Sequence, residues 1–281
     1  MKRDIGMSWL QLPLKINVNN KRKNKKKSRR TFIKSAAVTG MFAPFVISVF
    51  AVDNSNEKAN RKNIIYKDEE KDEYLQPIKK ELVKEWPKNK TINLVFHGHS
   101  VPSGYFVTPD VKPMQSYPLL LLKELKKSYP YAVINIILTC IGGENSEQGA
   151  RRFKKQVLNH KPDVLFIDYA LNDTGIGAAA SRKSWEYMIK EALKKNSKVI
   201  LLTATPDQRV DLLSKETDLQ KICTQVIELS KEYQTGLVDN YSVFQKLVSS
   251  GEKVTDYMSQ VNHPNEKGHQ LVVDGMMKYF R

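Results

Sequence analysis

The sequence from residue 92 to residue 100 reads INLVFHGHS, and it sets the expected architecture of the chain. Residues 92–96 are mostly apolar, which is typical of a strand buried on both faces of a parallel sheet. The segment that follows contains a glycine and ends on Ser100, whose hydroxyl can act as a nucleophile. The stretch therefore predicts a buried strand that carries a reactive serine at its carboxyl end.

The chain beyond residue 69 repeats this alternation of apolar runs and amphipathic stretches. Runs rich in valine and isoleucine predict strands at 92–96, 132–138, 164–169, 199–203 and 236–238. The stretches between them predict helices at 117–127, 146–159, 178–195, 218–233, 241–249 and 265–280. Connections of this length join parallel strands by right-handed crossovers, so we expect a three-layer α/β/α sandwich around a five-stranded parallel sheet.

Polar residues follow each of the first three expected strands and recur near the end of the chain. The four segments are HGHS at 97–100, IGGENS at 141–146, ALND at 170–173 and NHPN at 262–265. The carboxyl ends of parallel strands lie at one edge of a sheet, where ligands of such folds bind. A serine, a glycine-rich turn, an asparagine and a histidine at that edge can supply a nucleophile, oxyanion donors and a base.

These segments resemble the sequence blocks of the SGNH (GDSL-like) hydrolases, which include esterases, lysophospholipases and carbohydrate acetyl esterases. Gly98-His99-Ser100-Val101 stands where the family has Gly-Asp-Ser-Leu, and residues 141–149 look like the second block. Residues 170–173 resemble the Gly-x-Asn-Asp block, and His263-Pro264-Asn265 resembles the closing His-Pro block. The blocks occur in family order from residue 92 onward.

The resemblance implies a flavodoxin-like SGNH hydrolase fold and a serine ester hydrolase. Ser100 would be the nucleophile, and His263 would be the base that takes its proton. The main-chain N–H groups of Ser100 and Gly143 and the side-chain amide of Asn172 would form the oxyanion hole. Asp173 would stabilise its own loop. This chemistry requires no metal and no organic cofactor.

The first departure from the family concerns the acid that normally lies three residues before the histidine, where this chain has Gln260. The Nδ1 proton of His263 could be accepted by the Gln260 side-chain carbonyl, by a main-chain carbonyl, or by Asp256 or Asp239. We favour a Ser–His dyad with a neutral acceptor.

The second departure is His99, which replaces the family's aspartate. Together with His97 it puts two imidazoles beside the expected nucleophile, but no further cluster in the sequence completes a metal-ligand set. Both histidines are therefore expected to be structural, and no metal site is predicted. Downstream, the aromatic residues Tyr105, Phe106 and Tyr117 either line an acyl or sugar pocket or pack in the core.

The formal charge of the chain, +16, suggests a nucleic-acid binder until its distribution is considered. Residues 1–51 hold 12 of the 46 lysines and arginines and 1 of the 30 acidic residues, which leaves +5 on residues 52–281. No stripe of aromatic and basic residues accompanies this modest charge, so we expect no nucleic-acid partner. Cys140 and Cys223 are far apart and are expected to be small buried apolar residues.

The first 51 residues have the order of an export signal. Residues 28–34 (SRRTFIK) resemble the twin-arginine export motif, and an uncharged run from residue 35 to residue 51 follows. That run is shorter than the about 20 residues of a membrane span, so we expect no stable span in the mature protein. We expect a twin-arginine-type signal peptide at 1–51, a linker at 52–68 and one hydrolase domain at 69–281, in the periplasm or outside the cell.

Together these features predict an exported serine ester hydrolase that removes acyl groups, such as acetyl, from a small-molecule or polysaccharide ester. Two alternatives stay open. A lysophospholipase or thioesterase would act on longer acyl chains and would need an extended apolar groove. A non-catalytic glycan- or lipid-binding pseudo-enzyme is the alternative that Gln260 suggests. We expect the protein to be a monomer.

Overall fold

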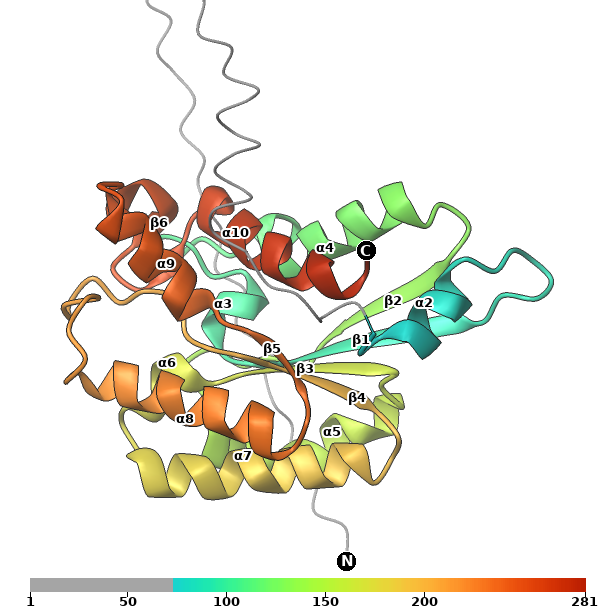
Figure 1. Cartoon of the computed structure of the whole chain (residues 1–281), viewed down its shortest axis with the longest axis horizontal. Coiled ribbons are helices and arrows are strands. Elements are labelled where there is room, and N and C mark those ends of the chain that lie inside the picture. The colour runs from blue at the N-terminus through green and yellow to red at the C-terminus, as the bar shows by residue number, and fades with distance from the viewer. Residues whose placement is uncertain (1–72) are drawn as a thin grey trace, which may run out of the picture. The chain divides into compact units, whose positions relative to one another are not determined.

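The computed structural model describes residues 73–281, which form a main sheet with helices on both faces (Figure 1). The expected signal peptide and linker lie outside these residues. Among the helices of residues 73–281, none is long and apolar enough to cross a lipid bilayer.

A five-stranded parallel sheet with strand order β2-β1-β3-β4-β5 forms the centre of the fold (Figure 1). The strands are β1 (Thr91–Gly98), β2 (Val133–Leu138), β3 (Val164–Asp168), β4 (Lys198–Leu202) and β5 (Gly236–Val238). This order is that of flavodoxin-like doubly wound folds, so the predicted fold class is confirmed. The strand order reverses between β1 and β3, and ligands of such sheets bind beside this point at the carboxyl ends.

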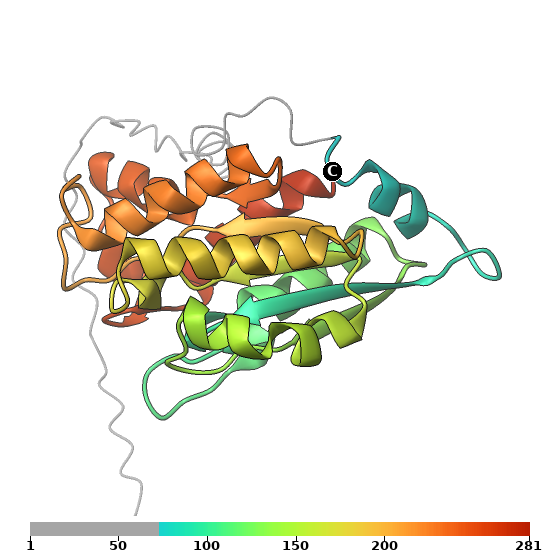
Figure 2. The same cartoon turned by 90° about the horizontal axis from the view of Figure 1, so that it is seen from below.

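Six long helices cover the two faces of the sheet. One face carries α4 (Tyr117–Ser128), α10 (Glu266–Met276) and, next to α10, α9 (Asn240–Ser249). On the other face, α7 lies between its two neighbours (Figure 2), and the three helices there are α5 (Ser146–Gln156), α7 (Ala178–Leu193) and α8 (Asp218–Glu232). All six predicted helices are therefore present. Two of them, α5 and α10, end three and four residues earlier than expected and are followed by the 3-10 turns η2 (Leu158–His160) and η4 (Met277–Tyr279).

The core lies between the sheet and these helices. Phe96 on β1 stacks on Phe166 of β3, with ring centroids 4.4 Å apart and an interplanar angle of 4°. Tyr117 of α4 packs against Phe96 at 5.9 Å. Both cysteines are free thiols; Cys223 is buried in the core, whereas Cys140 is half-buried. The inner strands are buried along their length, which explains their continuous apolar sequence.

Several short elements that the sequence pattern does not predict lie beyond the carboxyl ends of the strands. They are α3 (Ser100–Ser103) after β1, α6 (Ala170–Asp173) after β3, and the hairpin of β6 (Met258–Gln260) and β7 (His263–Pro264) before α10. An isolated bridge between Tyr105 and Val111 closes a further segment, the 105–111 hairpin. The remaining elements are α2 (Gln76–Leu82), η1 (Pro113–Gln115) and η3 (Val254–Tyr257). A helix of one turn has no amphipathic period, so sequence patterns cannot find it.

Candidate active site

Ser100 lies directly after the first strand, at the start of α3. Gly98 is the last residue of β1, and a Cβ atom there would lie 2.5 Å from the main-chain oxygen of Asp168 on β3, so only glycine fits. His99 then caps α3, because its Nδ1 accepts a hydrogen bond from the main-chain N–H of Val101 at 3.3 Å. This turn leaves Ser100 partly exposed at the edge of the sheet.

The imidazole of His263 lies beside this serine, with 2.8 Å between its Nε2 and the Oγ of Ser100. The two residues are 163 positions apart in the chain. His263 belongs to β7, and the ring of Tyr105 stacks on its imidazole with centroids 6.2 Å apart. The fold thus brings the predicted nucleophile and base within hydrogen-bond distance.

The imidazoles in and below the site favour the neutral form. Burial, and then the nearby imidazole of His99, lower the pKa of His263. Burial, and then His263, lower the pKa of His269 to about 3. Burial, and then Arg152, lower the pKa of His97 to about 3 as well. At neutral pH His263 is therefore able to accept a proton.

Gly143 lies on the loop that follows β2, and Asn172 lies in α6, the one-turn helix that follows β3. Gly143 is exposed and has φ +76°, a left-handed conformation that favours glycine. The Nδ2 of Asn172 donates to the main-chain oxygen of Glu144 at 2.9 Å, which leaves its second N–H available. The main-chain N–H of Ile141 donates to the oxygen of Gly98 at 3.0 Å. The side chain of Asn172 is therefore hydrogen-bonded to the loop after β2 that carries Gly143. That loop is in turn hydrogen-bonded to Gly98, two residues before the serine.

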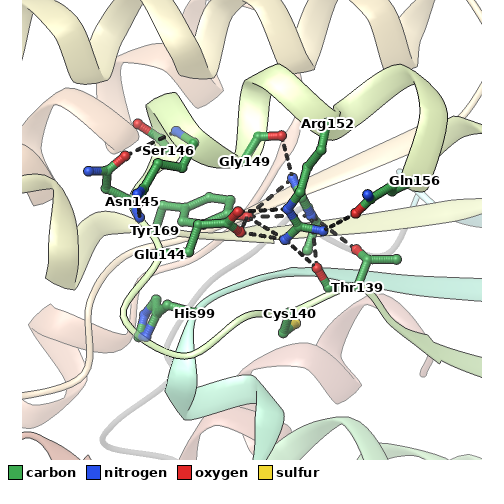
Figure 3. Close-up of polar contacts among 12 residues, drawn as sticks. His99, Thr139, Cys140, Glu144, Asn145, Ser146, Gly149, Arg152, Gln156 and Tyr169 are labelled. Carbon is green, nitrogen blue, oxygen red and sulfur yellow. Dashed lines mark hydrogen bonds and ion pairs between the residues drawn. The ribbon is translucent and has the colours of Figure 1, made fainter. Parts of the chain in front are cut away.

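A buried charge network anchors the loop that carries Gly143 (Figure 3). The carboxylate of Glu144 accepts hydrogen bonds from Arg152 Nε and from the Tyr169 hydroxyl, both at 2.7 Å. Arg152 also donates to the main-chain oxygen of Thr139 at 2.6 Å. A buried carboxylate is costly unless it is paired, so these contacts hold the backbone next to Gly143 in one place.

Asp173 has the structural role that the sequence analysis expects. Its fully buried carboxylate accepts hydrogen bonds from the main-chain N–H of Ser146 at 2.8 Å and from the Ser181 hydroxyl at 2.7 Å. It also accepts one from the indole N–H of Trp185 at 2.7 Å. These donors belong to α5 and α7, so Asp173 fixes the loop of its neighbour Asn172 against two helices.

Of the side chains proposed to orient His263, Gln260 is the one that touches it. The Nε2 of Gln260 faces the Nδ1 of His263, while its Oε1 accepts hydrogen bonds from the main-chain N–H and the hydroxyl of Thr108 at 3.1 and 3.3 Å. Asp239 instead caps α9. Within residues 73–281, the carboxylate of Asp256 makes no hydrogen bond or ion pair with the imidazole. Neither carboxylate reaches His263.

The three aromatic residues downstream of Ser100 separate into core and site positions. Phe106 and Tyr117 are buried, at 5% and 1% exposure, and they pack in the core. Tyr105 is 37% exposed and lies between the base and the oxyanion loop. A Cβ atom on Gly142 would lie 3.1 Å from its ring. Tyr105 alone of the three therefore borders the site.

His97 and His99 contact different partners. The Nδ1 of His97 lies 3.0 Å from the Thr139 hydroxyl, whereas the Nε2 of His99 lies 3.4 Å from the carboxylate of Asp168. Asp168 also accepts a hydrogen bond from the Tyr117 hydroxyl at 2.8 Å. In the described part of the chain, no group of three or more His, Cys, Asp or Glu side chains is placed to hold a metal ion.

A serine in contact with a histidine, at the carboxyl edge of a flavodoxin-like sheet, is the arrangement of an ester hydrolase of the GDSL-like class. The chain belongs to the GDSL-like Lipase/Acylhydrolase family, whose model matches residues 96–271.

Similar proteins agree with this fold. A two-domain esterase (CEX) active on acetylated mannans has a TM-score of 0.60 and 20% identity, over 74% of this chain and 52% of that one. The acetylxylan esterase Axe2 of Geobacillus stearothermophilus has a TM-score of 0.59 and 15% identity, over 70% and 95%. The uncharacterized lipoprotein YqeF of Bacillus subtilis (strain 168) is 33% identical over 81 residues, which are 26% of this chain and 33% of that protein. The chain thus matches about a third of this curated relative and half of the mannan esterase.

The network around Glu144 generates a stability prediction. Arg152→Met leaves a buried carboxylate without its cation and should lower the free energy of unfolding by about 3 kcal/mol, measured by urea denaturation. The matched control is Arg151→Met, because Arg151 is 71% exposed and pairs with Glu147 at the surface. Equal losses in the two variants would contradict the anchoring role. No sequence pattern separates Arg152 from Arg151, so the anchoring role of Arg152 could not be predicted.

Proposed function

We propose that this protein is an exported serine ester hydrolase that removes small acyl groups, acetyl above all, from carbohydrates or other hydroxyl-bearing substrates. The observation that carries the proposal is the 2.8 Å contact between Ser100 Oγ and His263 Nε2. A serine hydroxyl is too weakly acidic to attack an ester unaided, and an adjacent neutral imidazole supplies the missing base.

In the proposed reaction, the Ser100 hydroxyl attacks the ester carbonyl carbon while His263 Nε2 takes its proton. The oxyanion accepts hydrogen bonds from the main-chain N–H groups of Ser100 and Gly143 and from the second N–H of Asn172, each worth about 3 kcal/mol of barrier. The imidazolium then protonates the leaving alcohol, and an acyl-serine remains. Water activated by His263 hydrolyses this ester and frees the acid. The nucleophile, the base and the oxyanion donors all belong to the protein, so we propose no metal or cofactor.

Two observations support a small acyl group. The ring of Tyr105 stacks on His263 and lies against Gly142, so it occupies space between the base and the oxyanion loop. Solved structures with this fold include esterases active on acetylated mannans and on acetyl-xylooligosaccharides. The first observation favours a small acyl group such as acetyl, and the second favours a carbohydrate as the alcohol.

A longer acyl chain is the second candidate, and exposed apolar side chains favour it. Val107, Ile141 and Val261 are each exposed by 44% or more, and they lie on the segments that carry Tyr105, Gly143 and the β6–β7 hairpin. Exposed apolar side chains of this kind could contact an acyl chain. A glycan- or lipid-binding pseudo-enzyme is the third candidate, because Gln260 stands where a triad acid would.

The first prediction concerns the nucleophile. In Ser100→Ala, the hydrolysis of nitrophenyl acetate by the full-length protein should fall by about 1,000-fold or more, because within residues 73–281 no other hydroxyl is hydrogen-bonded to the imidazole of His263. Ser103→Ala is the matched control, since that hydroxyl donates to the oxygen of His99 instead and should leave most of the activity. Faster turnover of nitrophenyl octanoate than of the acetate would favour the long-chain candidate, and no turnover of either would favour the pseudo-enzyme.

The second prediction is a pH profile. The pKa of His263 is lowered by burial and then by His99, so its imidazole takes up a proton at lower pH than an ordinary imidazole does. The other ionisable groups near it are His269 and Tyr105. The acid limb of kcat/KM for nitrophenyl acetate should therefore lie below pH 6.5. A limb at or above that value would contradict the assignment of the base, and His160→Gln, at an exposed site, controls for general effects.

Export belongs to the same proposal. It is supported by the match of residues 28–34 to the twin-arginine motif and by the uncharged run that follows. On this basis residues 1–51 are the signal, residues 52–68 a linker, and residues 69–281 the hydrolase domain. The substrate would then be an ester accessible in the periplasm or outside the cell.

The third prediction tests the export route. Replacing both arginines of the motif, Arg29→Lys with Arg30→Lys, should retain the protein in the cytoplasm although the charge is unchanged. Fractionation of an expressing host followed by immunoblotting measures this. The control is Arg22→Lys, which makes the same exchange outside the motif. Unchanged export of the double variant would exclude the twin-arginine route.

A further inference from the structure

Gln260 makes two contacts that together constrain the imidazole of His263. On one side, its Oε1 accepts hydrogen bonds from the main-chain N–H of Thr108 at 3.1 Å and from the Thr108 hydroxyl at 3.3 Å. On the other side, its Nε2 faces the Nδ1 of His263. Thr108 lies on the 105–111 hairpin, which also supplies the ring of Tyr105 that stacks on the same imidazole.

The main-chain N–H of Thr108 determines which way the Gln260 amide is turned. A main-chain N–H can only donate, so it needs the amide oxygen as its partner. The amide NH₂ is then left for His263, and an NH₂ group can likewise only donate. The Nδ1 of His263 must accept that hydrogen bond, so it carries no proton.

This arrangement decides the tautomer of the neutral imidazole. With Nδ1 unprotonated, the ring proton lies on Nε2, the nitrogen that is 2.8 Å from Ser100 Oγ. In this state the imidazole donates to the serine. A general base must instead accept the serine proton at Nε2, which requires the proton on Nδ1.

We propose that Thr108 and Gln260 form a positioning pair that holds His263 in the Nε2-protonated tautomer in the resting protein. This inference rests on the proposed function, because it concerns the base of the same reaction. Catalysis then requires the amide of Gln260 to turn its oxygen toward Nδ1, which breaks the two hydrogen bonds from Thr108. The departure from the family at this position therefore slows the reaction without abolishing it.

In the unmodified protein, Thr108 and a protonated Nδ1 of His263 would both need the single amide oxygen of Gln260. A carboxylate at position 260 would remove this competition. In Gln260→Glu the side chain keeps its length, and both of its oxygens accept, so one can keep Thr108 while the other takes the Nδ1–H of His263. The variant should raise kcat for nitrophenyl acetate by about tenfold or more with KM little changed. It should also move the acid limb of the pH profile to higher pH, because a nearby negative charge raises the pKa of an imidazole. The other ionisable groups near His263 remain His99, His269 and Tyr105.

Gln208→Glu is the matched control for charge. Gln208 is exposed, and its Nε2 donates to the main-chain oxygen of Gln260 at 3.2 Å, so a carboxylate there adds the same charge nearby without touching the imidazole. It should leave kcat unchanged within about twofold. An equal gain in both variants would overturn the proposal in favour of a general charge effect.

Nitrogen-15 NMR of the histidine side chains tests the inference independently of turnover. In the full-length protein, the His263 signals should report a protonated Nε2 and an unprotonated Nδ1, and they should exchange these states in Gln260→Glu. The measurement works equally in Ser100→Ala, so an inactive protein still gives an answer. A protonated Nδ1 in the unmodified protein overturns the inference even if the protein is an active esterase. The predicted tautomer in a protein without esterase activity would support the pair and refute the proposed function.

Discussion

The parallel pairing of β1 with β3 determines where this fold can carry out chemistry. Gly98 lies opposite Asp168 in the register of the two strands and close against its main chain, so both strands end at the same level. The turn of Ser100 and the loop of Asn172 therefore start side by side at the point where the strand order reverses. The loop after β2 is hydrogen-bonded to the end of β1. Of the four proposed catalytic and oxyanion residues, His263 alone does not follow one of these three strands; it lies on the β6–β7 hairpin.

The polar groups beneath the site follow a consistent rule. Carboxylates that are buried there are paired with several donors, as Glu144 is with Arg152 and Asp173 is with the indole of Trp185. The imidazoles of His97 and His269 are kept neutral, because burial lowers the pKa of both to about 3. Fixed polar groups of this kind stabilise developing charge without having to reorganise. The loops that would bind an oxyanion are thereby held in place by the protein core.

The sequence predicted the sheet and the six long helices because buried parallel strands are continuous apolar runs and their crossovers are amphipathic. It also predicted that Ser100, Gly143 and Asn172 would lie at one edge of the sheet, since the carboxyl ends of parallel strands meet there. His263 instead lies on the β6–β7 hairpin, outside this sheet. The sequence could not predict the hydrogen bond from the main-chain N–H of Thr108 to Gln260, which joins positions 152 apart. This bond takes the amide oxygen of Gln260, so the NH₂ group and not the oxygen faces His263. Such contacts depend on tertiary placement of short hairpins that leave no periodic signal.

If Ser100 is a nucleophile activated by the adjacent imidazole, it should react with a fluorophosphonate probe. The full-length protein is treated with the probe, and the modified peptide is mapped by mass spectrometry. We expect one phosphonyl group per chain, on the peptide that contains Ser100, and none when His263 is replaced by alanine. Absence of labelling in the unmodified protein, or labelling of a different serine, would contradict it.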